Sequence, residues 1–273
     1  MANYKIIASD LDETLLNNKS EISRENIEAI KKLSRMGVHF VPCTGRSFSE
    51  LPKSVADIPE IRYVISSTGA AIDDRKTGQR ILECIGNEKV KKILDILFTY
   101  DMHLSYRKDG KIYVDARCTS ECDFEYYDIC KPHINVVKNY AVYLENFREE
   151  CYKSDNIEAM AVFFHDKKEL AECCEKIGEI EGLLIVSPWD NLEIMSADAG
   201  KGRALLALAK RLGIGEDETI SIGDSDNDIS MLESAALGLV VSNGKDSVKK
   251  IADKVICSNE EHTVRYVLEH FYE

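Results

Sequence analysis

The sequence lacks a long apolar run and contains little proline. No stretch approaches the roughly 18 consecutive apolar residues that cross a bilayer, and residues 1–5 do not resemble the basic start of a secretory signal. With only 5 prolines and 15 glycines in 273 residues, collagen-like and low-complexity chains are excluded. These absences predict a globular protein of the cytoplasm.

Positive charge is also scarce. The chain has 35 basic and 48 acidic residues, which gives a formal net charge of -13. Such a chain does not present the broad basic surface that nucleic acids or anionic lipids require. We therefore expect neither a nucleic acid nor a membrane as a partner, and any bound phosphate group must be held by a few local side chains.

The length and the apolar pattern indicate the fold class. At roughly 150 residues per domain, 273 residues correspond to one large or two modest domains. Near both ends of the chain, apolar runs typical of buried strands alternate with helical patterns. Strands are expected at 4–9, 38–42, 63–66, 219–222 and 237–241, and helices at 23–36, 47–56, 201–212, 228–235 and 260–270. This alternation predicts a parallel sheet covered by helices.

The middle of the chain has a different pattern. A helix near 88–100 precedes two strands, 104–107 and 111–115, and the Asp109-Gly110 pair between them predicts a hairpin. After a polar, cysteine-rich connection, a strand, a helix and a strand are expected at 158–164, 167–180 and 183–186. We predict an α/β fold with a core of residues 1–84 and 191–273 and an inserted α+β domain of residues 85–190.

Polar residues gather at the predicted strand ends and at one helix start. Open parallel sheets bind their ligands at the carboxyl ends of the strands, so these segments are candidates for a site. They are Asp10-Leu11-Asp12-Glu13-Thr14, Thr44-Gly45-Arg46, Lys201-Gly202 and Gly223-Asp224-Ser225-Asp226-Asn227-Asp228.

The carboxylates in these segments suggest two kinds of chemistry. Asp10 and Asp12 are two residues apart at a strand exit, so one can attack a substrate while the other moves a proton. The run from Asp224 resembles the start of a calcium-binding EF-hand loop, but Ile229 and Ala235 stand where that loop needs Gly and Glu. A magnesium site shared with Asp10 is the favoured interpretation.

The hydroxyl of Thr44, the backbone amide of Gly45 and the cation of Arg46 can together hold a phosphoryl group. A simple turn, or an Arg46 that faces the second domain, are the alternatives. Lys201 is either an ordinary helix-start residue or an ammonium that offsets the repulsion among the carboxylates.

In this order the four segments resemble the motifs of the haloacid dehalogenase-like phosphatases, specifically the Cof-type, subclass IIB capped branch. D-x-D-x-T matches Asp10 to Thr14, a strand-end threonine matches Thr44, a lysine matches Lys201, and G-D-x-x-N-D matches Gly223 to Asp228. The resemblance extends over nearly the whole chain. It implies a Rossmann-like core with an inserted cap of the C2B type.

The resemblance also implies roles for individual residues. Asp10 would be the nucleophile and Asp12 the acid/base, while Thr44 and Lys201 would hold the phosphoryl group. Substrate contacts are expected from Thr44, Gly45, Arg46, Lys201 and Asn227. Magnesium ligands are expected from Asp10, Asp12 (through its backbone carbonyl), Asp224 and Asp228.

The expected function is that of a magnesium-dependent phosphatase. Its substrate would be a small phosphorylated metabolite, such as a sugar phosphate or a pyridoxal phosphate-like compound, cleaved through an aspartyl-phosphate. A phosphotransferase or mutase that uses the same intermediate, and a non-catalytic phosphometabolite sensor, are the alternatives. The inserted domain would act as a lid, with leaving-group contacts sought among Tyr106, Arg107, Lys108, Tyr113, Arg117 and Trp189.

Two segments depart from the family pattern, and one cysteine spacing leaves a question open. Thr68 stands where such proteins usually carry Asn before Gly-Ala, and Ser242 lies in a segment that is more usually Met-Gly-Asn-Ala. The nine cysteines fit reduced thiols better than a disulfide framework. Zinc is one interpretation of the spacing of Cys118, Cys122, Cys130 and His133, and partly buried thiols beside a surface imidazole are the favoured one.

Overall fold

The computed structural model describes residues 4–186 and 191–273, and the chain divides into two compact units. The first unit comprises the residues up to Arg46, Leu51–Ile81 and Gly200–Glu273, and the second comprises Ser47–Glu50 and Leu82–Ala199. The predicted domain limits, 84/85 and 190/191, remain predictions, because compactness alone does not make a segment fold independently.

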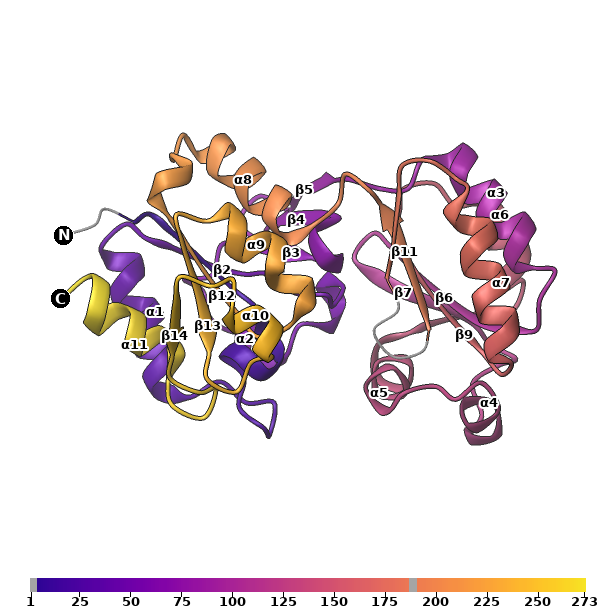
Figure 1. Ribbon diagram of the computed structural model, residues 1–273, viewed down its shortest axis with the longest axis horizontal. Helices are drawn as coiled ribbons and strands as arrows, with labels where there is room; N and C mark the ends of the chain where they lie inside the picture. Colours follow the sequence, from indigo (N-terminus) through magenta and orange to yellow (C-terminus); the bar gives the residue numbers. More distant parts are fainter. Residues whose placement is uncertain (1–3, 187–190) are drawn as a thin grey trace. The chain divides into compact units, whose positions relative to one another are not determined.

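A five-stranded parallel sheet forms the centre of the first unit (Figure 1). Every residue of β1, an interior strand of this sheet, is buried, as expected for a parallel strand that is covered on both faces. In spatial order the strands are β14 (Lys254–Ile256), β13 (Leu237–Val241), β12 (Thr219–Gly223), β1 (Ile6–Ser9) and β2 (His39–Pro42). The predicted α/β class with a parallel sheet is confirmed.

Helices cover this sheet through apolar side chains at helical spacing. Ile6 and Ala8 of β1 pack with Leu205 and Leu208 of α8 and with Met231 of α9. On α1, the hydroxyl of the N-cap residue Ser23 accepts a hydrogen bond from the third helical amide, and α1 packs against α11 and β2. The helices are α1 (Arg24–Arg35), α2 (Lys53–Ala56), α8 (Lys201–Leu212), α9 (Ile229–Ser234), α10 (Asp246–Lys249) and α11 (Thr263–Phe271).

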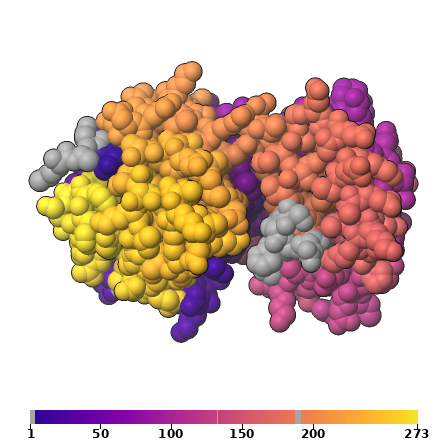
Figure 2. Space-filling view, in the orientation of Figure 1, coloured from indigo at the N-terminus to yellow at the C-terminus, as the bar shows by residue number. Residues whose placement is uncertain are grey.

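Both ends of the chain build the first unit. The space-filling view shows indigo segments from the amino-terminal part on the same surface as yellow segments from the carboxyl-terminal part (Figure 2). Among the described residues, no helix has the length and apolarity that crossing a bilayer requires.

Two of the expected elements need correction. The strand predicted at 63–66 is present as β3 (Tyr63–Ser66), but it belongs to a small sheet with β4 (Ala71–Asp74) and β5 (Gln79–Leu82), and it pairs with β4 in antiparallel fashion. A single parallel bridge, between Cys43 and Ile65, joins it to the end of β2.

The continuous helix predicted at 47–56 is wrong. A short 3-10 turn, η2 (Phe48–Glu50), is followed by α2, and Pro52 is the N-cap of α2. Proline has no backbone N–H to continue the helical hydrogen bonds, and it favours extended geometry in the residue before it. A new helix therefore begins after Pro52.

The second unit contains a six-stranded sheet in which neighbouring strands run antiparallel, with the exception of β7 and β8. Its order is β10 (Leu183–Val186), β11 (Leu192–Ser196), β9 (Ile157–Phe164), β6 (Met102–Lys108), β7 (Lys111–Asp115) and β8 (Val142–Leu144). The predicted hairpin between β6 and β7 is confirmed, with Asp109 at φ 52° and Gly110 at φ 71°.

Each face of this sheet has its own apolar cluster. On one face, Leu104 and Val162 pack against α3 (Asn87–Leu97), α6 (Phe147–Lys153) and α7 (Lys167–Gly178). On the other face, Ala161 and Phe163 pack against α4 (Glu121–Tyr126) and α5 (Lys131–Tyr140). The sequence predicts only a polar connection where α4, α5 and α6 lie, because α4 and α6 are short and rich in charged residues.

Candidate active site

Three loops at the carboxyl ends of β1, β12 and β2 carry the predicted site residues other than Lys201, which begins α8. Asp10 follows β1, Asp224 follows β12, and Thr44 lies two residues beyond β2. The backbone N–H of Asp10 donates to the carbonyl of Ile222, which holds the first two loops together (2.9 Å). Parallel strands bring these loops to one edge of the sheet, as the sequence predicts.

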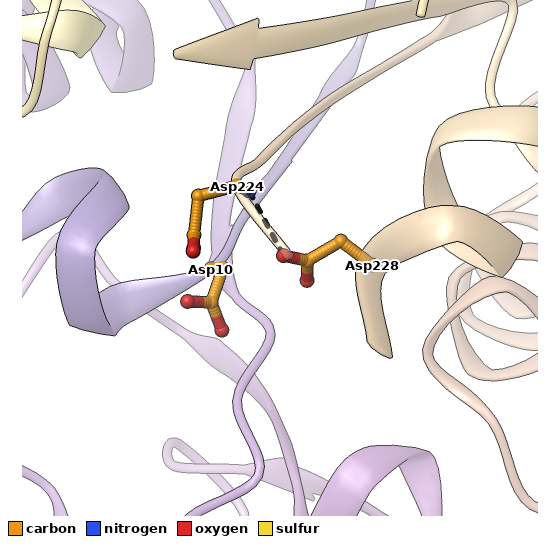
Figure 3. A group of neighbouring side chains, drawn as sticks. All are labelled: Asp10, Asp224 and Asp228. Atoms are coloured by element: carbon orange, nitrogen blue, oxygen red, sulfur yellow. Dashed lines mark hydrogen bonds between the residues drawn. The ribbon is translucent and has the colours of Figure 1, made fainter. Parts of the chain in front are cut away.

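A group of three buried carboxylates lies at this edge. Asp10, Asp224 and Asp228 place one oxygen each within 4.8 Å of one another. Figure 3 shows the three side chains pointing toward a common region from separate segments. One oxygen of Asp228 also accepts the backbone N–H groups of Asp224 and Ser225, at 3.0 and 3.1 Å, which fixes the loop after β12 around it.

Lys201 balances part of this negative charge. Its fully buried ammonium lies 2.6 Å from Oδ1 of Asp10 and 2.7 Å from Oδ1 of Asp228. Lys201 is the first residue of α8, and Gly202 follows it where a Cβ would lie 2.1 Å from the carbonyl oxygen of Ser230. The Lys201-Gly202 pair therefore lets α8 approach α9 closely enough for the ammonium to reach the carboxylates.

Burial and charge determine the protonation of the cluster. Burial and the carboxylates of Asp228 and Asp224 raise the pKa of Asp10, while Lys201 opposes this rise. Burial raises the pKa of Asp224 to about 6, with a further contribution from Asp228. Burial acts to lower the pKa of Lys201, but the carboxylates of Asp10 and Asp228 outweigh it and raise that pKa, so the ammonium stays charged.

The donor set fits a hard divalent cation. When ionised, the three carboxylates carry more negative charge than the single ammonium neutralises, and all the candidate donor atoms are oxygens. Oxygen ligands and excess negative charge are what Mg2+ requires, and it usually binds through one or two carboxylates. Asp10 and Asp224 are the better candidates, because both oxygens of Asp228 already accept hydrogen bonds.

Asp12 lies apart from this cluster. Its carboxylate forms a bidentate ion pair with Arg46, with 2.7 Å from Nη2 to Oδ1 and 2.8 Å from Nε to Oδ2. The metal contact expected of Asp12 involves its backbone carbonyl and remains a prediction.

Thr44 and Gly45 form the loop after β2. Thr44 is buried, and its Oγ1 accepts the backbone N–H of Arg46 at 3.1 Å. The carbonyl of Thr44 accepts the N–H of Thr68 at 3.0 Å, so the loop after β3 is held beside it. The contacts expected between substrate and Thr44, Gly45 and Arg46 remain predictions.

The loop after β3 has an unusual backbone. Ser67 and Thr68 adopt left-handed φ angles of 50° and 55°, a region that a β-branched residue seldom occupies. Gly69 follows at φ 90°, where a Cβ would lie 2.3 Å from the backbone of Gly200. Thr68, the departure from the family pattern, therefore lies in a strained loop packed against the start of α8.

Two further residues, Thr14 and Asn243, connect the site loops, and the sequence alone predicts no role for them. Thr14 donates from Oγ1 to Oδ1 of Asp224 at 2.9 Å and so joins the first and fourth motifs. In the segment that begins at Ser242, Asn243 donates to the carbonyl of Glu13 at 2.8 Å. The only sequence feature that could have pointed to Thr14 is its place at the end of the D-x-D-x-T pattern.

Asn227 is exposed, and its side-chain oxygen accepts a hydrogen bond from the hydroxyl of Ser225 at 2.9 Å. Its expected contact with the substrate remains a prediction.

The candidate leaving-group residues of the second unit have structural partners. Tyr106 is buried and stacks on Tyr113, with their ring centroids 5.1 Å apart. The charged candidates form ion pairs: Arg107 with Glu50, Lys108 with Asp155, and Arg117 with Asp115. Trp189 lies outside the described residues.

The spacing that suggested zinc does not form a cluster. Within residues 4–186 and 191–273, the group of Asp10, Asp224 and Asp228 is the only one in which three or more potential ligands place donor atoms within 4.8 Å. Cys118 and Cys130 are half-buried, Cys122 is exposed, and His133 is buried with Nε2 3.3 Å from Oγ of Ser105. The expected surface imidazole is thus a buried one.

Comparison with known proteins identifies the family. The sequence profile of the haloacid dehalogenase-like hydrolases matches residues 7–268. The chain belongs to the haloacid dehalogenase-like hydrolase family. The resemblance predicted from the four motifs, and with it an enzyme of the hydrolase class, is confirmed.

Relatives of this haloacid dehalogenase-like hydrolase match it over almost its full length. Phosphatase YwpJ of Bacillus subtilis (strain 168) is 31% identical over 282 residues, covering 97% of this chain and 99% of that protein. The 5-amino-6-(5-phospho-D-ribitylamino)uracil phosphatase YwtE of the same organism is also 31% identical, covering 97% of each chain. The crystal structure of TM0651 from Thermotoga maritima is similar with a TM-score of 0.83 at 27% identity, covering 99% of this chain and 98% of that one.

Proposed function

We propose that the protein is a magnesium-dependent phosphatase that hydrolyses a small phosphorylated metabolite of the cytoplasm through an aspartyl-phosphate on Asp10. The observation that carries this proposal is the buried ammonium of Lys201, 2.6 Å from Asp10 and 2.7 Å from Asp228, beside a third carboxylate at the edge of a parallel sheet. Because charged groups are costly to bury, their concentration here supports a chemical role.

In the proposed first step, a carboxylate oxygen of Asp10 attacks phosphorus. An oxygen–phosphorus bond forms to Asp10, and the bond from phosphorus to the leaving-group oxygen breaks. Asp12 gives its carboxyl proton to that leaving oxygen and retains the electron pair as a carboxylate. Lys201, with the hydroxyl of Thr44 and the amide of Gly45, would stabilise the phosphoryl oxygens.

In the second step, water attacks the phosphorus of the aspartyl-phosphate. Asp12 takes a proton from that water, the bond between phosphorus and Asp10 breaks, and inorganic phosphate leaves with the Asp10 carboxylate restored. A magnesium ion bound to Asp10 and Asp224 would supply positive charge that reduces the repulsion between the attacking carboxylate and the phosphate dianion.

The expected substrates are sugar phosphates or pyridoxal phosphate-like compounds. The name of the relative YwtE supports the first class, because it describes the phosphate ester of a ribityl chain, a sugar-like polyol. The strong net negative charge of the chain also favours a small ligand held locally over a polyanion.

The test is phosphate release from sugar phosphates, pyridoxal phosphate, nucleotides and an aryl phosphate, with and without Mg2+. We expect Mg2+-dependent release that falls at least roughly 1000-fold in Asp10→Asn. Asp226→Asn, which changes an exposed acid outside the buried cluster, is the control and should retain activity. Release that persists in Asp10→Asn would overturn the assigned nucleophile, and a phosphorylated acceptor in place of free phosphate would indicate a transferase.

A further inference from the structure

The ion pair between Asp12 and Arg46 stands out because both partners lie near the surface of the first unit. The side chain of Asp12 is 50% exposed and that of Arg46 is 23% exposed. Exposed ion pairs contribute little to stability, so stability alone does not account for this one. Its geometry is nevertheless specific, because two parallel N–H donors hold both carboxylate oxygens at 2.7 and 2.8 Å.

Arg46 is held in place by three loops of the first unit. Its backbone N–H donates to Oγ1 of Thr44 at 3.1 Å, and its backbone carbonyl accepts the N–H of Ser67 at 2.8 Å. Its guanidinium reaches Asp12 in the loop after β1. Arg46 thus connects the loops that follow β1, β2 and β3, and its backbone has little freedom to move.

Asp12, in contrast, is not oriented by regular structure. It lies within the irregular turn η1 (Leu11–Leu15) at φ −71° and ψ 133°, and Glu13 beside it is left-handed at φ 56°. Within the described residues, Arg46 supplies all the side-chain hydrogen bonds that Asp12 makes. Without this partner, a half-exposed carboxylate would sample several rotamers.

We infer that Arg46 is a positioning residue that orients the Asp12 carboxylate for proton transfer to the leaving group, an inference that rests on the proposed function. A carboxylate has about four lone-pair sites, and the guanidinium fork takes one on each oxygen. The remaining sites stay available for the proton that Asp12 gives to the leaving oxygen and later takes from water. Arginine suits this role better than lysine, because its fork fixes the plane of the carboxylate.

The inference makes a prediction about leaving groups that a structural role would not share. The aryloxide of an aryl phosphate such as p-nitrophenyl phosphate is a good leaving group and departs without a proton. The alkoxide of an alkyl phosphate is a poor leaving group and needs a proton from a general acid. In Arg46→Ala we expect kcat/KM for an alkyl phosphate to fall roughly 100-fold further than kcat/KM for p-nitrophenyl phosphate, which is the scale of general acid catalysis. Arg46→Lys should behave like Arg46→Ala, because it restores the charge without the fork.

A double-mutant cycle tests whether Arg46 acts through Asp12. In an Asp12→Asn background, Arg46→Ala should cause no further loss with the alkyl phosphate, because the group that it orients is already inactive. Arg62→Ala is the matched control. Arg62 forms a similar bidentate pair with Asp74 in the same unit, at 3.0 and 2.8 Å, and its loss should affect both esters equally.

The outcomes separate this inference from the proposed function. If Arg46→Ala lowers kcat/KM equally for both esters and Arg46→Lys rescues it, Arg46 contacts the phosphoryl group and the inference is overturned, while the phosphatase stands. Losses that add in the Asp12→Asn background would overturn it as well. If the unaltered protein cleaves neither ester with Mg2+, the proposed function fails and the inference fails with it.

Discussion

The buried site cluster of the first unit and the buried histidine of the second unit are two different ways to bury polar groups. In the first unit, the buried ammonium of Lys201 lies between the buried carboxyl groups of Asp10 and Asp228 and contacts both within 2.7 Å. In the second unit, His103 is 1% exposed, neither of its ring nitrogens has a hydrogen-bond partner, and it lies among aromatic rings that include Phe124. Burial lowers the pKa of His103 to about 4, so it remains neutral at physiological pH.

The two kinds of buried polar group have different energetic costs. A buried neutral imidazole behaves as one more aromatic ring of a core, and its cost is limited to unmade hydrogen bonds. Buried charges cost far more, and proteins keep them where charge itself is needed. The second unit also buries an ion pair, Arg107 with Glu50, but among the described residues only the edge of the parallel sheet gathers three buried carboxyl groups around one ammonium. This concentration supports the proposed site there, and the comparison predicts how the two units respond to mutation.

Removal of the buried ammonium should have the largest effect. Lys201→Met leaves Asp10 and Asp228 without their cation, so we expect activity to fall roughly 100- to 1000-fold. The free energy of unfolding should fall by about 3–5 kcal/mol, because uncompensated buried charges remain. Chemical denaturation and phosphate release measure the two effects.

The second unit offers the control for this change. Lys153 pairs with Glu149 on α6 but is 60% exposed, so Lys153→Met should cost less than about 1 kcal/mol and leave activity unchanged. Equal effects of Lys201→Met and Lys153→Met would contradict the distinction between the two units.

The buried imidazole should make the second unit sensitive to acid. The pKa of His103 is lower in the folded state, at about 4, than the usual 6.5 of an unfolded chain. Its contribution to stability is therefore complete above pH 6.5 and is lost as the pH falls toward 4, by about 3 kcal/mol in all. In His103→Phe this part of the pH dependence should disappear, as followed by hydrogen exchange of β6 and β9.

Phe124→Leu supplies the comparison, since it alters the same cluster without removing a titratable group. It should lower stability by the same amount at pH 7 and pH 4.5. If His103→Phe also shifts stability equally at both values, the imidazole is not a neutral packing group.

Magnesium should stabilise the first unit through its carboxylates. At a concentration 100 times its Kd, an ion that binds only the folded state adds about 2.7 kcal/mol to the free energy of unfolding. We expect most of this gain to be absent in Asp224→Asn and present in Asp226→Asn, whose exposed carboxylate pairs with Lys245. Thermal unfolding with and without Mg2+ measures the gain, and an undiminished gain in Asp224→Asn would remove that residue from the ligands.

The smallest effect concerns backbone strain at the site. Thr68 adopts φ 55°, which asparagine tolerates better than a β-branched residue, so Thr68→Asn should raise the free energy of unfolding by about 1 kcal/mol. In the second unit, Asp109 has a similar φ of 52° in the hairpin, and Asp109→Asn should change stability by less than about 0.5 kcal/mol, since both residues tolerate this region. A loss in Thr68→Asn would show that its hydroxyl matters more than its backbone.

Where apolar spacing is strong, the sequence predicted the elements with accuracy. The bounds 63–66, 183–186, 201–212 and 237–241 agree with β3, β10, α8 and β13. The prediction was wrong where the apolar pattern was weak or where a proline interrupted a helical pattern. The helix α4 has six residues, of which three are acidic, and Pro52 divides a segment whose spacing otherwise favours one helix.

The site follows the same rule. The strand-end positions of Asp10, Thr44 and Asp224 could be read from the sequence, because each polar segment directly follows an apolar strand. The pairing of Asp12 with Arg46 could not be predicted from the sequence. The arginine side chain is long, the aspartate is half-exposed, and either could pair with another residue. The burial of His133 was not predicted, although Val137, four residues later on α5, lies on the same helix face and is fully buried.

The sequence by itself determined the family, the alternation of strands and helices and the types of group in the site, because these depend on local spacing and on side-chain chemistry. Only the tertiary structure decided which charges meet. Lys201 and Asp10 are 191 residues apart in the chain, and they meet because α8, which begins at Lys201, packs on β1, which ends just before Asp10. Contacts of this kind depend on how the whole sheet assembles, and no local spacing encodes them.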